Sequence, residues 1–244
     1  MQKVSAEKLL EYGGHFGHQT RRWNPKMGEY LYGSDQGVHL FDLIKTKTCI
    51  EEALEELTIA SSAGKSILFV GTKKQVKDKV TEVAQKSGSF YMSERWLGGT
   101  LTNFEQIQKS LKNLEDLKDK KSSGSFAGYT KKERLLIDRK IERIERFFKG
   151  LIGLNSLPDY MVIVDVKREV GAVREAKRMG VKLVAIVDSN SDPTDVDIVI
   201  PMNDDAAKAL NYVIDLMGEA ILSGKKKLSA REASENGKEK NGKN

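Results

Sequence analysis

Two short stretches of the chain combine arginine, tryptophan and small polar side chains, a mixture that suits contact with a nucleic acid. The first is the glycine-rich segment 13–27, where the candidate contact residues are Arg21, Arg22, Trp23, Asn24 and Lys26. Cationic side chains neutralise phosphates, and an indole face stacks on a base or a sugar. The alternative is a tryptophan that packs on the core beside solvated arginines, and these residues alone do not decide between the two.

The second stretch is residues 93–104, where arginine and tryptophan again adjoin. Gly98 and Gly99 allow the backbone to approach a partner closely or to adopt a positive φ. The candidate contact residues here are Arg95, Trp96, Thr100, Thr102 and Asn103. Taken alone, this stretch fits a glycine turn with a core tryptophan better. Together with the first stretch, it predicts two solvent-facing loops that grip a polyanion.

Lys73 and Lys74 follow a strand-like run at residues 66–71 and are weaker candidates for phosphate contacts. A strand, a glycine turn and a helix also occur in nucleotide-binding sites. Residues 64–66 carry only the end of a P-loop pattern and precede the strand, and Gly71 is not followed by the dinucleotide fingerprint. We therefore predict no bound cofactor and no catalytic residues.

Two histidines, His15 and His18, raise the question of a metal site. They are three residues apart in a segment without cysteine or acidic residues, and zinc typically takes about four ligands. No metal site is predicted on this basis. Asp188, Asp204 or Asp205 could approach the histidines in space, and the sequence leaves open whether such a group binds a divalent ion.

Bulk composition describes a soluble globular protein with a heavily charged surface. The 244 residues are 39% hydrophobic and 31% charged, with a formal net charge of +6 that fits a polyanionic partner. No apolar run approaches the roughly 18 residues of a membrane span, and the N-terminus lacks the apolar region of a secretory signal. Cys49 is the only cysteine, which excludes an intramolecular disulfide. These features predict a cytoplasmic protein without a membrane partner.

Alternating apolar runs and helical patterns predict the architecture. Buried parallel strands are expected at residues 66–71, 157–165, 181–187 and 197–201, with helices between them and a closing helix at 204–223. This alternation predicts a parallel sheet with helices on both faces. Residues 30–41 predict a β-hairpin, and residues 13–27 are expected to form an ordered loop without regular structure.

A different pattern interrupts this alternation after residue 103. Two highly charged helical segments, each with a narrow apolar stripe, predict an antiparallel helical hairpin inserted between the second and third strands. The expected organisation is a discontinuous α/β domain of residues 1–103 and 150–223, a hairpin at 104–149, and a basic disordered tail at 224–244.

The chain resembles the bacterial small-subunit ribosomal protein S-two family from Met1 to about Ser223. The motifs that carry the resemblance are residues 9–27, 95–103, 157–159, 185–193 and 200–205, in that order. The resemblance implies a flavodoxin-like, Rossmann-type three-layer domain with five parallel strands and a coiled-coil hairpin. It implies a structural role in translation, through binding of small-subunit ribosomal RNA and other small-subunit ribosomal proteins, including docking of ribosomal protein S-one. It implies no catalysis and no small-molecule substrate.

Two alternatives stay open beside this interpretation. A nucleotide- or metal-binding doubly wound protein would use the polar groups at the strand ends, namely Gly71, Asp165 and residues 188–192. No nucleophile–base set supports an enzyme, and a fold alone does not imply activity. An interaction scaffold would bind protein through the hairpin and the sheet edge.

Overall fold

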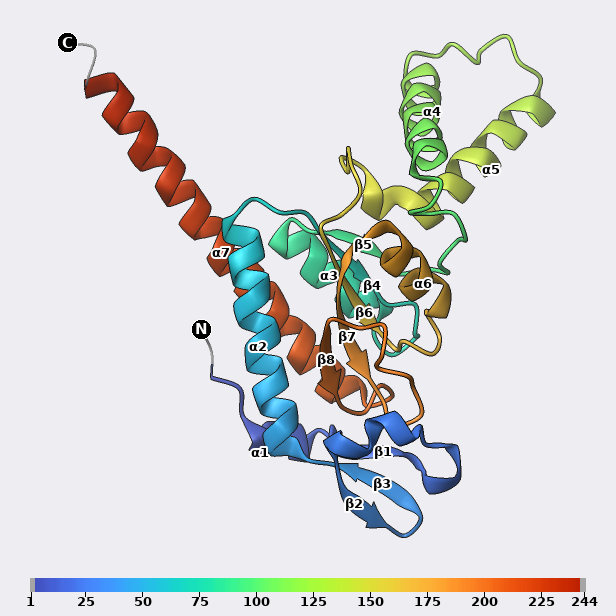
Figure 1. The fold of residues 1–244 in the computed structure, drawn as a ribbon. Helices are drawn as coiled ribbons and strands as arrows, with labels where there is room; N and C mark the ends of the chain where they lie inside the picture. The colour runs from blue at the N-terminus through green and yellow to red at the C-terminus, as the bar shows by residue number, and fades with distance from the viewer. Residues whose placement is uncertain (1–2, 242–244) are drawn as a thin grey trace.

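A five-stranded parallel sheet forms the centre of the computed structural model, which describes residues 3–241 (Figure 1). The strands are β4 (Ile67–Val70), β5 (Phe90–Met92), β6 (Tyr160–Val164), β7 (Lys182–Val187) and β8 (Ile198–Pro201), in the order β5-β4-β6-β7-β8. Counted along the chain this is the 2-1-3-4-5 order of flavodoxin-like sheets. The predicted five-stranded parallel sheet is confirmed.

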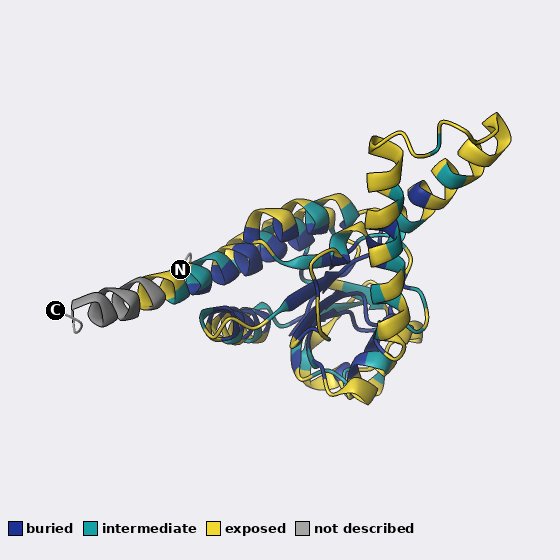
Figure 2. Cartoon of the chain, turned by 90° about the horizontal axis from the view of Figure 1, so that it is seen from above, coloured by how far each residue is buried: buried dark blue, intermediate teal, exposed yellow. Residues whose placement is uncertain are grey.

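Helices cover both faces of this sheet and make three layers. On one face lie α2 (Leu43–Ser62), α3 (Lys77–Ser87) and α7 (Ala207–Asn241), and on the other lies α6 (Val170–Met179). Successive strand residues alternate between the two apolar clusters, because side chains of a strand point to opposite faces. Ile67 and Phe69 pack on the α2 side, whereas Leu68 and Val70 pack on the α6 side. Figure 2 shows these strands as the buried centre of the molecule.

A small antiparallel sheet near the N-terminus follows helix α1 (Ala6–Glu11). Its strands β1 (Phe16–Gln19), β2 (Leu31–Asp35) and β3 (Val38–Phe41) lie in the order β1-β3-β2. The hairpin expected at residues 30–41 is confirmed, but the prediction that residues 13–27 lack regular structure is wrong. They form β1 and the 3-10 turns η1 (Thr20–Arg22) and η2 (Pro25–Tyr30). Gly17 serves close packing here, since a Cβ would lie 2.8 Å from Ser189 Oγ.

Helices α4 (Phe104–Ser122) and α5 (Lys131–Phe148) form the insertion between β5 and β6, and the turn η3 (Lys149–Leu151) follows them. Two ion pairs join the helices, from Lys118 to Glu145 at 2.5 Å and from Lys121 to Asp138 at 2.8 Å. Thr130 begins α5 with a capping box. Figure 1 shows both helices projecting from the body of the protein.

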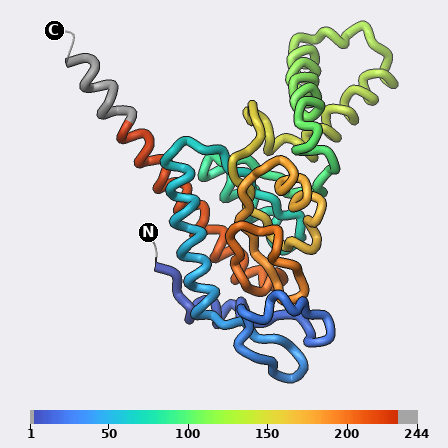
Figure 3. The backbone as a smooth tube through the Cα atoms, in the orientation of Figure 1, coloured from blue at the N-terminus to red at the C-terminus, as the bar shows by residue number. Residues whose placement is uncertain are grey.

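The closing helix is longer than predicted. We expected it to end at Ser223 before a disordered tail, but α7 continues to Asn241, and residues 242–244 lie outside the described part of the chain. Figure 3 shows α7 running alongside α2. Gly224 lies within α7 at a point of close approach to α2, because a Cβ there would lie 2.5 Å from the Thr58 carbonyl oxygen. Within residues 3–241, no helix is both long and apolar enough to cross a bilayer.

Candidate nucleic-acid interface

The chain that follows strand β1, through η1 and the start of η2, carries residues 20–26, which we call the basic loop. Arg21 and Arg22 are exposed, and Trp23 keeps 40% of its surface accessible. Arg21 Nε donates to Gln19 Oε1 at 2.9 Å. Neither arginine has a carboxylate within 4.0 Å among the residues that the structure describes. The prediction that this loop faces solvent is confirmed.

Other residues of the basic loop hold it in place. Asn24 accepts a hydrogen bond from the Lys26 backbone at 3.0 Å, and its own backbone donates to the Ser189 carbonyl at 2.7 Å. Lys26 Nζ lies 2.8 Å from both Asp192 and Thr194. Asp192 accepts hydrogen bonds from Lys26 and also from the backbone and hydroxyl of Thr194, and these bonds lower its pKa to about 2. Asn24 and Lys26 thus anchor the loop to the segment after β7.

The ring of Trp23 is supported on one side. Its centroid lies 4.9 Å from that of His39 with the planes tilted by 37°. Gly28 passes below the indole, since a Cβ at that position would be 3.5 Å from its ring. The indole is therefore held in place while a large part of its surface stays open to a stacking partner.

The second predicted loop, residues 95–103, lies against α6 and is partly buried. Trp96 is only 8% exposed, so the expectation that its indole faces solvent is wrong. The Thr100 hydroxyl is also buried and donates to the Leu97 carbonyl at 2.6 Å. Arg95, Thr102 and Asn103 remain at the surface. The loop folds inward because one carboxylate accepts hydrogen bonds from several of its backbone and side-chain groups.

That carboxylate belongs to Glu175 on α6. Its Oε1 accepts from Trp96 Nε1 at 3.1 Å and from the Gly99 backbone at 2.8 Å. Its Oε2 accepts from the Leu101 backbone at 2.9 Å and from both the backbone and hydroxyl of Thr102 at 3.1 and 3.2 Å. Burial alone would raise the pKa of Glu175, but these hydrogen bonds outweigh it and lower the pKa. Sequence reasoning missed Glu175, because nothing in a helical segment more than 70 residues away marks it.

Lys73 is placed in the interior, where it does not face solvent as a phosphate contact would require. Lys73 is only 9% exposed, and its ammonium pairs with Asp165 at 3.0 Å, Asp204 at 2.6 Å and Asp205 at 2.8 Å. Burial lowers the pKa of Lys73, but hydrogen bonds to Asp204 and Asp205 outweigh it and raise the pKa overall. Lys74, the next residue, is exposed.

One predicted histidine joins this polar cluster and the other does not. His18 Nδ1 lies 3.0 Å from Asp188, which raises the pKa of the imidazole through a hydrogen bond. His15 instead stacks on Phe16 with ring centroids 3.9 Å apart. Ligand atoms of His18, Asp188 and Asp204 lie within 4.8 Å of one another, close enough to hold a divalent cation. The Lys73 ammonium already neutralises Asp204, so we assign no metal to this cluster.

Asp204 is the most perturbed carboxyl of the cluster. Burial raises its pKa to about 7, and the nearby charges of Asp188 and Asp165 act in the same direction. Asp165 itself adopts a positive φ of 68° at the end of β6, where its Oδ1 accepts from the Arg168 backbone at 2.9 Å. The ion pair of Asp165 with Lys73 therefore fixes the start of the loop that carries Arg168.

The comparisons with known proteins agree with this architecture. A family model described as "Ribosomal protein S2" matches residues 9–224. The "Small ribosomal subunit protein uS2" of Prochlorococcus marinus (strain MIT 9312) is 43% identical over 226 residues, covering 93% of this chain and 97% of that protein. The protein of the same name from Geotalea uraniireducens (strain Rf4) is 43% identical over 224 residues, covering 92% of this chain and 88% of its own. The chain therefore belongs to the ribosomal protein S2 family.

Proposed function

We propose that this protein is a constituent of the small ribosomal subunit, in the cytoplasm, that binds ribosomal RNA. Its curated relatives carry the name of a small-subunit protein. As a member of a ribosomal protein family it is a structural component and not an enzyme. Its role is to hold RNA and neighbouring ribosomal proteins together.

The basic loop carries this proposal. Two exposed guanidiniums without an ion-pair partner among the described residues directly precede, in sequence, a supported, 40% exposed indole. Guanidiniums bind phosphate oxygens bidentately, and an aromatic face stacks on an unpaired base. Such contacts follow backbone shape and single-stranded geometry rather than base sequence.

A second contact region uses the surface residues around the Glu175-bound loop. Arg95, Lys74, Thr102 and Asn103 are exposed there and offer cations, a hydroxyl and an amide. Trp96 and Thr100 shape this loop from below, as Asn24 and Lys26 do for the basic loop. Lys73 supports the region through its buried ion pairs.

Co-sedimentation tests the proposal. We expect the native protein to sediment with the small ribosomal subunit at low salt and to be released as salt is raised, because phosphate contacts weaken with ionic strength. Replacing Arg21 and Arg22 together by alanine should lower the salt concentration at which half the protein is released. A protein found only in the soluble fraction at low salt would contradict the proposal.

For the insertion we propose a coiled-coil hairpin that contacts proteins. Leu135 and Leu136 on α5 are half-exposed, and Leu111 and Ile141 are buried in α4 and α5. The family resemblance adds docking of ribosomal protein S-one as the expected partner interaction. A chain lacking residues 105–149 should keep its RNA binding and lose co-purification with ribosomal proteins, and retention of both would contradict this assignment.

A further inference from the structure

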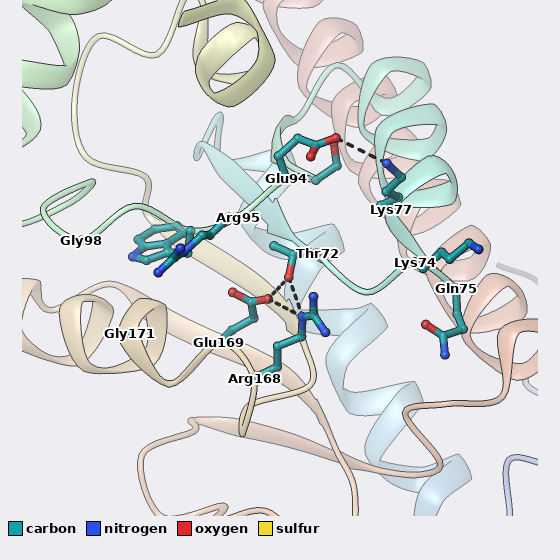
Figure 4. Close-up of a pocket in the computed structure, with 12 residues that line it drawn as sticks. Thr72, Lys74, Gln75, Lys77, Glu94, Arg95, Gly98, Arg168, Glu169 and Gly171 are labelled. Carbon is teal, nitrogen blue, oxygen red and sulfur yellow. Dashed lines mark hydrogen bonds and ion pairs between the residues drawn. The ribbon is translucent and has the colours of Figure 1, made fainter. Parts of the chain in front are cut away.

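A cavity of about 870 Å³ lies at the carboxyl ends of β5, β4 and β6 (Figure 4). Thr72 follows β4, residues 93–96 follow β5, and Arg168 and Glu169 follow β6. The strand order reverses between β4 and β6, which is where open α/β sheets bind their ligands. The volume falls within the roughly 300–1,000 Å³ of small-molecule sites.

Cations outnumber carboxylates around this cavity. The charged lining residues are Lys74, Lys77, Arg95 and Arg168 against Glu94 and Glu169. Lys77 pairs with Glu94 at 3.4 Å, and Arg168 Nε donates to Thr72 Oγ1 at 2.9 Å. Within the described part of the chain, Arg95 and Lys74 have no carboxylate within 4.0 Å. In Figure 4, Arg95, Arg168 and Lys77 approach the cavity from three sides, so the site favours an anion.

Glu169 favours a ligand that also carries a hydrogen-bond donor, which a simple anion lacks. It is only 2% exposed, and one of its oxygens accepts a hydrogen bond from the Thr72 hydroxyl. Figure 4 shows the other oxygen on the side of Arg95. A carboxylate accepts hydrogen bonds, so it suits a hydroxyl or amine donor. The matching ligand therefore has an anionic end and a donor-bearing end a short distance apart.

We propose that this cavity binds a nucleotide. Its phosphate lies against Arg95 and Arg168, and a ribose hydroxyl or base amine donates to Glu169. An unstacked RNA residue and a free mononucleotide present the same groups, so either can be the source. With RNA as the source, the inference rests on the proposed function and specifies the ligand of its second contact region. With a free nucleotide as the source, it stands independently.

The test uses the full chain carrying Trp23→Phe, which leaves Trp96, a lining residue, as the single tryptophan. Adenosine monophosphate, adenosine, inorganic phosphate and a hexamer of single-stranded adenylate RNA are titrated at low salt. Trp96 fluorescence and isothermal titration calorimetry follow the binding. We expect saturation by the mononucleotide, or by the hexamer alone if RNA is the source. Adenosine and phosphate should each bind at least about tenfold more weakly, because each lacks one of the two ends.

Two variants tie the binding to the cavity. Arg95→Ala should weaken the nucleotide about tenfold, as expected for loss of one charge-assisted contact. Gly98→Leu should abolish binding by filling the cavity, since no heavy atom lies within 4 Å of a Cβ there. Gly128→Leu is the matched control, because its Cβ is equally free and it does not line the cavity.

Three results would overturn the inference: no saturable binding of either the mononucleotide or the hexamer, equal binding of phosphate alone, or binding unaffected by both cavity variants. Sedimentation with the small subunit is measured in parallel on the chain that keeps Trp23. A protein that sediments normally but binds no nucleotide refutes the cavity assignment alone. A protein that binds the mononucleotide but does not sediment refutes the proposed function alone.

Discussion

Replacing Glu175 by glutamine should destabilise the protein and loosen the loop at residues 95–103. Five donors converge on the two oxygens of this carboxylate, two on Oε1 and three on Oε2. A glutamine amide has only one oxygen, so its NH₂ group must face either the two donors or the three. At least two charge-assisted hydrogen bonds are lost in either orientation.

Each lost bond to a charged group costs about 1.5–3 kcal/mol when the donor stays buried. Water reaches part of the Glu175 side chain and takes over some of the lost hydrogen bonds. We therefore expect a total loss of about 2–3 kcal/mol in the free energy of unfolding. For a chain of this size the melting temperature should fall by about 5–10 °C. Urea unfolding at pH 7 measures the difference, and Glu115→Gln on the exposed face of α4 is the control.

The loss should also depend on pH. Because the pKa of Glu175 is lowered in the folded protein, its charge stabilises the fold above the ordinary carboxyl pKa of 4.5. That stabilisation disappears as the pH falls through the lowered value, where the native side chain becomes protonated. The difference in the free energy of unfolding between the native protein and Glu175→Gln should therefore be largest at pH 7 and shrink below about pH 4. A gap under about 0.5 kcal/mol at pH 7, or one that widens on acidification, would refute this reasoning.

Two further substitutions test the packing and the charge cluster. Gly224→Ala should lower the free energy of unfolding by about 1–3 kcal/mol, because the new Cβ meets the Thr58 carbonyl oxygen, and this outweighs the better helix propensity of alanine. Gly128→Ala is the control, because its Cβ meets nothing within 4 Å. Thermal unfolding of both variants measures the difference. Lys73→Met should cost about 3–5 kcal/mol in the free energy of unfolding at pH 7.5, because it leaves three carboxylates without their ammonium. The loss should be smaller at pH 5.5, because Asp204, whose pKa is about 7 even with the Lys73 ammonium beside it, is protonated there. A loss that grows on acidification in urea unfolding would contradict this.

Much of the fold could be predicted because its signals are local. The apolar runs of β4, β6, β7 and β8 are bounded by turns, and their length separates strand from helix. Strand β5 has only three residues, too few for a pattern, and it was expected only from the family resemblance. The helix end was predicted at Ser223 because the sequence becomes polar from residue 224 onward, but Gly224 lies within α7, where it lets this helix approach α2 closely.

The candidate site was less predictable, because its partners come from distant parts of the chain. Arg21 and Trp23 were predicted to face solvent and do so. Trp96 also follows an arginine in the sequence, yet it is buried because Glu175 on α6 holds its loop. Lys73 was assigned to the surface because its three carboxylate partners lie at the ends of other elements. Local composition could not reveal these contacts.

The salt dependence of RNA binding tests the central claim most directly. The logarithm of the dissociation constant for small-subunit ribosomal RNA is measured against the logarithm of salt concentration for the native protein and for Arg21→Ala with Arg22→Ala. The double variant should bind more weakly, and its slope should fall by about 1–2 units, since each lost phosphate contact removes roughly 0.7–0.9. Lys226→Ala with Lys227→Ala, which removes two exposed charges from α7, is the matched control and should change the slope less. An unchanged slope in the arginine variant, or an equal change in the control, would contradict the claim that the basic loop holds RNA.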